Sequence, residues 1–215
     1  MIDGMTAEEW NKRGIELTSR GKYEKALDAY DKAVEIDPQF DGAWYNKGVA
    51  LSKLGKYEKA LDAYIKATEI NPQDADGWYN QGNVLKQLGR YEEALDAYNK
   101  AVEINPRHAA VRYNQGMVFK ELKRYKEALG AFNKAVEIDP RDAASCHNRG
   151  SALTMLKRYK EALDAFNKAI ELDPQNADAW YNKGVVLELI GMDYAAEDSY
   201  SKAIKIDPLY AELQN

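Results

Sequence analysis

The chain has 215 residues, of which 45% are hydrophobic and 30% charged, and its 30 basic and 35 acidic residues give a formal net charge of −5. This composition excludes a disordered chain, and the acidic balance disfavours nucleic-acid binding, which requires a basic surface. Charges interrupt every apolar stretch before the roughly 18 residues that a transmembrane helix needs, and the N-terminus lacks a signal-peptide pattern. The single cysteine, Cys146, excludes an intrachain disulfide. We therefore expect a cytoplasmic protein that does not bind membranes.

The prolines indicate an internal repeat. They lie 34 residues apart, at Pro38, Pro72, Pro106, Pro140, Pro174 and Pro208. The predicted repeats are 7–40, 41–74, 75–108, 109–142, 143–176 and 177–210, preceded by a lead-in at 1–6 and followed by 211–215, the start of a truncated seventh repeat or a tail. A fixed period of this length predicts one solenoid domain of stacked repeats. Positions within a repeat are numbered 1 to 34 below.

Each repeat is predicted to form two helices. Thr6 and Glu9 make a capping-box pattern, so the first helix should begin there. In the second repeat, apolar residues at three- and four-residue spacings predict helices over 41–54 and 57–70, separated by a turn at 55–56. The helix-capping residues expected in later repeats are Asp74, Asp142 and Asn176.

Small residues recur where the helices should approach one another. Position 8 is glycine and positions 20 and 27 are alanine in all six repeats, while position 24 is always aromatic. Glycine inside a helix costs about 1 kcal/mol relative to alanine, so its recurrence indicates close helix packing. A single helical hairpin cannot bury this surface, and each repeat therefore needs neighbours.

These spacings resemble the tetratricopeptide repeat. The resemblance implies an all-α, right-handed superhelical solenoid of antiparallel helix hairpins. The chain departs from the family pattern at position 7, which carries Arg13, Lys47, Gln81, Gln115, Arg149 and Lys183. We expect the stems of these side chains to cover apolar surface while their polar ends reach water. Arg112 and Cys146 replace the usual tryptophan at position 4, and Cys146 should be a small buried hydrophobic residue.

No motif indicates catalysis. Cys146 and His147 are neighbours on one predicted helix, where residues i and i+1 do not face each other. His108 and His147, the only histidines, lie in different repeats and form no metal-binding pair. The glycine-lysine turns lack the spacing of a phosphate-binding loop. We predict a non-enzymatic protein with no catalytic residue, metal or cofactor.

The resemblance implies a concave groove along positions 2, 5, 9 and 12 of the first helices, where peptides bind in this family. Candidate groove residues are Tyr45, Tyr79, Tyr113, His147 and Tyr181 at position 5, Asn46, Asn80, Asn114, Asn148 and Asn182 at position 6, Asn83 at position 9, and Lys86 and Lys120 at position 12. Rigid tyrosines beside amides suit peptide recognition. The predicted function is therefore a protein-interaction scaffold and adaptor. The same tyrosine-asparagine pair also belongs to the family scaffold, so a purely structural role is the alternative.

The sequence also bears on other kinds of partner. The lysine at position 5 that this family uses to hold acidic chaperone tails is absent, so a chaperone C-terminal tail is disfavoured. The unfinished seventh repeat suggests head-to-tail self-association, a fragment of a longer array, or an engineered array without a dedicated partner. A cluster of Lys123, Arg124, Lys157 and Arg158 at the hairpin turns either aids solubility or binds an acidic group.

Overall fold

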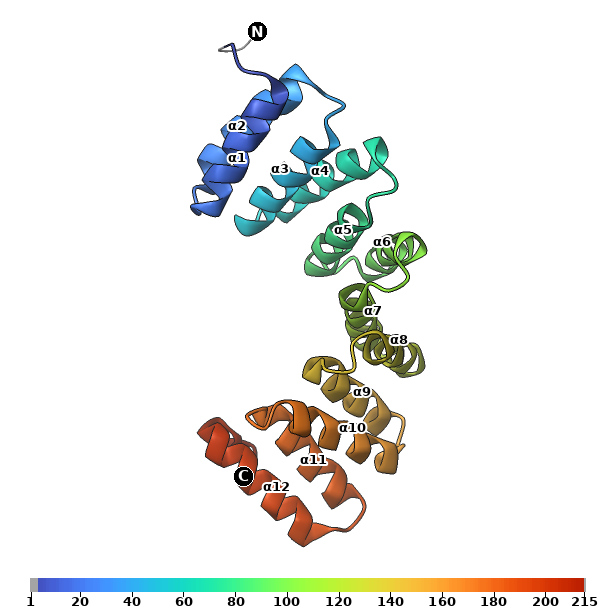
Figure 1. The fold of residues 1–215 in the computed structure, drawn as a ribbon. Coiled ribbons are helices and arrows are strands. Elements are labelled where there is room, and N and C mark those ends of the chain that lie inside the picture. The colour runs from blue at the N-terminus through green and yellow to red at the C-terminus, as the bar shows by residue number, and fades with distance from the viewer. Residues whose placement is uncertain (1–3, 215) are drawn as a thin grey trace. The chain divides into compact units, whose positions relative to one another are not determined.

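A computed structural model describes residues 4–214, and within that range the chain is helical with no strand. The α-helices are α1 (Ala7–Ser19), α2 (Tyr23–Ile36), α3 (Asp41–Lys53), α4 (Tyr57–Ile70), α5 (Ala75–Gln87), α6 (Tyr91–Ile104), α7 (Ala109–Glu121), α8 (Tyr125–Ile138), α9 (Ala143–Met155), α10 (Tyr159–Leu172), α11 (Ala177–Leu189) and α12 (Asp193–Ile206), followed by the 3₁₀ helix η1 (Pro208–Gln214) (Figure 1). Two helices per 34-residue period confirm the predicted hairpins. Residues 1–3 of the expected lead-in and residue 215 lie outside the described range.

The helices form two compact units. The N-terminal unit extends to Pro106 and contains α1–α6, and the C-terminal unit begins at Arg107 and contains α7–α12 and η1. In both, the two helices of a repeat pack against each other, and the second helix also packs on the first helix of the next repeat. Consecutive first helices contact each other directly at α1–α3, α7–α9 and α9–α11. The side of each unit formed by its first helices is called the first-helix face below.

Glycine at position 8 fits against the aromatic ring at position 24 of the same hairpin. A methyl group at Gly116 would lie 2.5 Å from Cε1 of Phe132, and one at Gly82 would lie 2.5 Å from Cε1 of Tyr98. Both rings are fully buried. The glycine expected from its recurrence is therefore needed because any side chain would overlap a core ring.

The turn between the two helices requires a left-handed residue. Gly55 and Gly89 have φ values of 70° and 72°. Lys123 and Lys157 take the same conformation in the next two repeats, with φ values of 57° and 59°. Non-glycine residues are uncommon in this region, so these two turns carry backbone strain that the glycine turns avoid.

The helix starts are capped as expected. Thr6 and Glu9 form the reciprocal capping box, with Glu9 N donating to Thr6 Oγ1 at 3.2 Å and Thr6 N donating to Glu9 Oε2 at 2.8 Å. The side chains of Asp74, Asp142 and Asn176 cap α5, α9 and α11. These contacts satisfy amides that the first turn of a helix leaves without partners.

The tryptophan at position 4 closes the loop that precedes it. Nε1 of Trp44 donates to the carbonyl of Pro38 at 3.0 Å, and Trp78 and Trp180 make the equivalent bonds to Pro72 and Pro174. Cys146 occupies this position in the fifth repeat and is fully buried beside Ala169 and Ala179, which confirms its predicted packing role.

The position-7 side chains follow the prediction only in part. Arg13, Lys47 and Lys183 lie over the tryptophan rings of their own helices, with the cation 4.9–5.2 Å from the ring centroid. Gln115 contradicts the expectation that all these polar ends reach water, because it is only 3% exposed. It accepts a hydrogen bond from Arg112 Nη1 at 3.2 Å instead, so the arginine that replaced tryptophan brings its own buried polar partner.

Candidate functional site

In the N-terminal unit, the predicted residues of the first-helix face form a bonded row. Tyr45 packs edge-on against Tyr64 with ring centroids 5.8 Å apart, and Tyr79 packs against Tyr98 at 6.2 Å. Asn80 Nδ2 donates to the Tyr45 hydroxyl at 3.0 Å, and burial raises the pKa of Tyr45. The remaining predicted residues here are Asn46, which donates to Asn11, Asn83, which accepts from the Tyr98 hydroxyl, and Lys86 in the last turn of α5.

The C-terminal unit repeats this arrangement. Tyr113 packs against Phe132 at 5.9 Å, His147 against Phe166 at 5.6 Å, and Tyr181 against Tyr200 at 5.3 Å. Asn148 Nδ2 donates to the Tyr113 hydroxyl at 3.3 Å, Asn182 lies 3.4 Å from Nε2 of His147, and Lys120 donates to Asn148 Oδ1 at 2.9 Å. The remaining predicted residue, Asn114, lies on α7 and is buried.

The hydrogen bonds assign the asparagines to the scaffold. Each joins position 6 of one repeat to position 5 of the repeat before it, as in Tyr45 with Asn80 and Tyr113 with Asn148. Asn80 and Asn148 also donate to backbone carbonyls of their own helices. The amide nitrogens that the sequence suggested for a peptide backbone are thus used between repeats. The tyrosine rings remain half-buried on the first-helix face.

The first-helix face of the C-terminal unit contains a cavity of about 340 Å³. Lys120 lines it from α7, Thr154 and Met155 from α9, and Asn182 and Val185 from α11. Phe166 forms its buried floor. Only Lys120 and Asn182 among these residues were predicted from the sequence. The apolar residue at position 13, Met155, was the overlooked signal, because earlier repeats carry Ser19, Lys53, Gln87 and Glu121 there.

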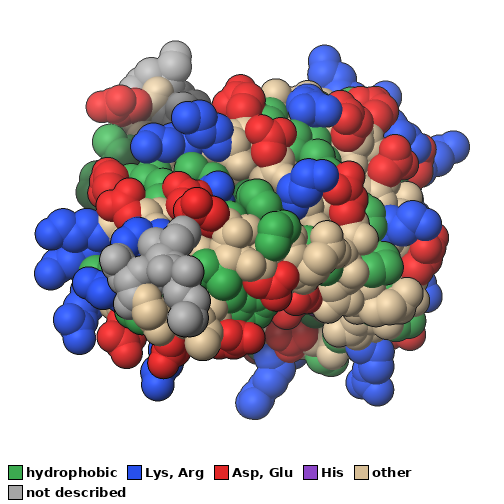
Figure 2. Space-filling model, turned by 90° about the horizontal axis from the view of Figure 1, so that it is seen from above, with side chains coloured by type: hydrophobic (Ala, Val, Ile, Leu, Met, Phe, Trp, Pro, Cys, Tyr) green, Lys and Arg blue, Asp and Glu red, His purple; other side chains and the backbone are tan. Residues whose placement is uncertain are grey.

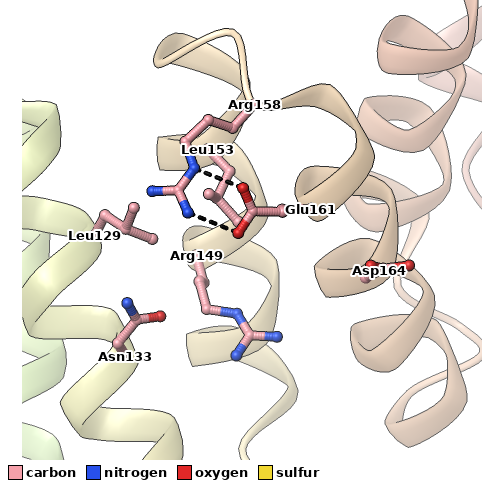
Figure 3. Close-up of a pocket in the computed structure, with 7 residues that line it drawn as sticks. All are labelled: Leu129, Asn133, Arg149, Leu153, Arg158, Glu161 and Asp164. Carbon is pink, nitrogen blue, oxygen red and sulfur yellow. Dashed lines mark hydrogen bonds and ion pairs between the residues drawn. The ribbon is translucent and has the colours of Figure 1, made fainter.

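A second cavity lies on the face formed by the second helices. In the C-terminal unit it measures about 230 Å³, with Leu129 and Asn133 from α8, Arg149 and Leu153 from α9, and Arg158 beside Glu161 (Figure 3). Residues 68 positions earlier line a cavity of about 270 Å³ in the N-terminal unit, among them Leu61, Leu85, Arg90 and Glu93. Because the cavity recurs with the repeat and its Arg158 and Glu161 neutralise each other, it is a feature of the repeat geometry.

Two of the four basic residues clustered at the hairpin turns, Arg124 and Arg158, pair with acidic side chains. Arg158 donates two hydrogen bonds to Glu161, at 2.7 and 2.6 Å, and Arg124 donates one to Glu127 at 2.9 Å. Figure 2 shows basic and acidic side chains interspersed over the visible face. Such exposed i,i+3 pairs contribute little to stability, but they reduce the local positive charge.

Chemical features of the described residues are few. Within residues 4–214, no three histidine, cysteine, aspartate or glutamate side chains gather in a way that could hold a metal ion. No helix in that range has the length and apolarity to cross a bilayer. Burial raises the pKa of the Cys146 thiol, which disfavours the reactive thiolate.

His147 titrates in an unusual setting. Burial lowers its pKa below the ordinary 6.5, with a further lowering by Lys120 and an opposing contribution from Asp178. The folded state therefore binds this proton more weakly than the unfolded state. Stability from the neutral imidazole is present above pH 6.5 and is lost as the pH falls through the window between the unfolded and folded pKa values.

We predict that His147→Tyr, which installs the residue present in the flanking repeats, will remove this pH dependence. As the pH is lowered from 7 to 5, the wild type should lose stability relative to the variant. The difference between their free energies of unfolding should change by about 1.4 kcal/mol for each unit by which the folded state depresses the pKa of His147. Urea denaturation followed by circular dichroism measures it. Other titrating groups are common to both proteins and cancel. A difference that stays constant over this range would contradict a buried neutral His147.

The comparisons place these features in a known class. The tetratricopeptide repeat pattern matches residues 42–74, 75–108, 109–142 and 177–210, and a second TPR repeat pattern matches residues 14–55 and 150–191. The chain belongs to the tetratricopeptide repeat family, whose fold is a scaffold for protein–protein interaction. No curated protein sequence matches the chain.

Solved structures agree with this assignment. YrrB, described as a TPR protein with an unusual peptide-binding site, is 31% identical to the chain, with 87% of this chain and 98% of YrrB covered and a TM-score of 0.76. PilF of Pseudomonas aeruginosa, at 22% identity, covers 97% of this chain and 96% of its own with a TM-score of 0.80. MamA, at 23% identity, covers 76% and 96% with a TM-score of 0.73. The last two similarities concern the fold alone.

Proposed function

We propose that the chain is a non-enzymatic adaptor that binds a peptide or helix of a partner protein in the concave groove along its first-helix face. This proposal is carried by the half-buried aromatic side chains that each of the two units has at position 5, each packed against a ring of the second helix. Aromatic residues held in this way lose little conformational freedom on binding. The 31% identity to YrrB, a protein described as having a peptide-binding site, supports the same proposal.

Two triple variants separate peptide recognition from a purely structural role. In the first variant, alanine replaces Tyr45, Tyr79 and Tyr113 and so removes their rings. In the second, phenylalanine replaces the same three residues and removes only their hydroxyls, such as those bonded to Asn80 and Asn148. Peptides selected from a random phage-displayed library by the wild type serve as ligands. We expect the alanine variant to bind them at least about tenfold more weakly, because anchoring aromatic residues each contribute more than 1 kcal/mol. The phenylalanine variant should bind nearly normally.

A matched control lies on the opposite face. Lys66, Lys100 and Lys134 occupy one position of the second helices, and each pairs with a glutamate three residues later. Changing all three to alanine should leave peptide affinity unchanged. Circular dichroism must show equal helix content in every variant. Failure to select any peptide, or equal binding by the alanine variant, would contradict the proposed function.

The self-associating solenoid is the second proposal for this chain, and the surface of α12 does not favour it. Asp193 and Glu197 are exposed on α12, and Asp198 on the same helix pairs with Lys202. Burying charged side chains in a contact with a second copy costs free energy. Light scattering over a range of concentrations distinguishes the two proposals, because end-to-end association raises the mass with concentration whereas an adaptor without such contacts stays monomeric.

A further inference from the structure

The cavity on the first-helix face of the C-terminal unit has a smaller ring beside its floor than the flanking repeats provide. The fifth repeat has His147 at position 5, where both flanking repeats have tyrosine, and the His147 ring lies 5.6 Å from that of Phe166. Phe166 has no hydroxyl, and neither has Phe132 at the same position of the fourth repeat. In the repeats that carry tyrosine at position 24, the hydroxyl bonds a neighbouring first-helix side chain, as Tyr98 bonds Asn83 and Tyr200 bonds Glu188. The cavity floor therefore offers carbon surface alone.

The polar groups around this cavity are largely satisfied by the fold. The hydroxyl of Ser151 donates to the carbonyl of His147 at 3.3 Å, and that of Thr154 donates to the carbonyl of Gly150 at 2.9 Å. Both bonds stay within α9. The cavity thus suits an apolar side chain, since little hydrogen bonding is lost when water leaves.

One exposed apolar side chain, Met155, lines the cavity, and a second, Leu189, lies on the neighbouring helix α11. Met155 and Leu189 occupy position 13 of α9 and α11, and each is 55% exposed. The four earlier repeats carry polar residues at this position. Because α9 and α11 contact each other, the two side chains lie on adjacent helices. Burying such a side chain on binding strengthens a complex by about tenfold or more.

Charge changes sign along position 12 of the three first helices that supply the cavity lining. Position 12 is Lys120 on α7, Thr154 on α9 and Glu188 on α11, and the first two line the cavity. Lys120 gives one of its three N–H groups to Asn148, and Glu188 accepts one hydrogen bond from Tyr200. Both can therefore accommodate a further partner. A cation on α7 and an anion on α11 define complementary charges for a ligand.

We infer that the cavity floored by Phe166 binds one apolar side chain of a partner peptide, with an acidic residue of that peptide beside Lys120 and a basic residue beside Glu188. This inference rests on the proposed peptide-binding function and specifies its partner. A uniformly acidic or uniformly basic segment would place one of its charges beside a like charge. Leucine or methionine matches the size and flexibility that an open apolar cavity with a methionine rim accepts.

Four synthetic peptides test the inference by fluorescence anisotropy at low salt. Three carry a central leucine flanked by one acidic and one basic residue, by two acidic residues, or by two basic residues. The fourth has the mixed flanks and a central alanine. The wild type should prefer the mixed leucine peptide, by about two- to fivefold for each charge. It should bind the alanine peptide about tenfold more weakly.

Charge-reversal variants give the sharpest readout. Lys120→Glu should shift the preference to the peptide with two basic flanks, and Glu188→Lys to the peptide with two acidic flanks. Both shifts should shrink as salt is raised. Because the expected result is an altered ranking, a variant that merely loses stability cannot imitate it. The peptide that each charge variant should prefer has two identical flanks, so this preference is independent of the direction in which the peptide lies.

The apolar rim is tested by Met155→Glu. Met155 is exposed, so the variant should fold, and it should bind leucine and alanine peptides with similar weak affinity. Equal binding of all four peptides by the wild type, or unchanged rankings in the charge variants, would overturn the inference. Peptides selected from the random library that bind with no sensitivity to Met155→Glu would overturn it while leaving the proposed function standing.

Discussion

Changing Phe132 to alanine is expected to lower the free energy of unfolding by about 3–5 kcal/mol, the usual cost of removing a fully buried aromatic ring. Phe132 is 0% exposed and belongs to a core cluster with Leu153 and Phe166. Its loss leaves a cavity where three helices of the C-terminal unit meet. Urea denaturation monitored by far-UV circular dichroism gives the comparison with the wild type.

Tyr194→Ala is the matched control for this change. Tyr194 is also aromatic but is 92% exposed at the start of α12. Its removal should change the free energy of unfolding by no more than about 0.5 kcal/mol. Similar effects of the two substitutions would show that the position-24 rings do not form the core described above.

Gly116→Ala is expected to destabilise the protein although alanine is the better helix former. The new methyl group would lie 2.5–2.8 Å from three carbons of the Phe132 ring, and the ring is enclosed. Overpacking of this kind costs about 1–3 kcal/mol, which exceeds the gain in helix propensity of about 1 kcal/mol. Denaturation under the same conditions measures the net loss.

Gly130→Ala should have the opposite sign. Gly130 lies within α8, is exposed, and has no atom within 4 Å of an added methyl group, so only the propensity gain of up to about 1 kcal/mol remains. A second check uses the Phe132→Ala background, in which Gly116→Ala should become neutral or stabilising because the ring is gone. If Gly116→Ala destabilised both backgrounds equally, the contact with the ring would not be the cause.

The fold was predictable because the sequence patterns that specify it connect residues that are close together in the chain. Helix periods, the Thr6 cap and the prolines each appear in the sequence with fixed spacing, and all were confirmed. The buried state of Gln115 was not predictable in the same way, because it depends on Arg112 one turn earlier replacing the usual tryptophan. A long polar side chain covers apolar surface or becomes buried according to its partner, and the partner is set by packing.

The helix positions of the candidate residues were predictable from the sequence, but their hydrogen bonds and the cavity were not. Helical spacing located Tyr113 and Lys120 on the first-helix face, where the structure has them. The hydrogen bond from Asn148 to Tyr113 joins residues 35 apart, so the assignment of the amide to the scaffold required the packing of two repeats. The cavity over Phe166 lies where a phenylalanine at position 24 and the smaller ring of His147 occur in the same repeat, and neither residue indicates a cavity by itself.

The hydrogen bonds between repeats also limit how such a chain can change length. Asn148 reaches back 35 residues to Tyr113, and Trp180 reaches back six residues to Pro174. One extra residue within a repeat would shift the longer bond out of alignment, whereas duplication or loss of a whole repeat would preserve both. A lineage carrying this pattern can therefore gain or lose binding surface only in steps of a complete hairpin, and the order of its repeats becomes a heritable arrangement of side chains along one face.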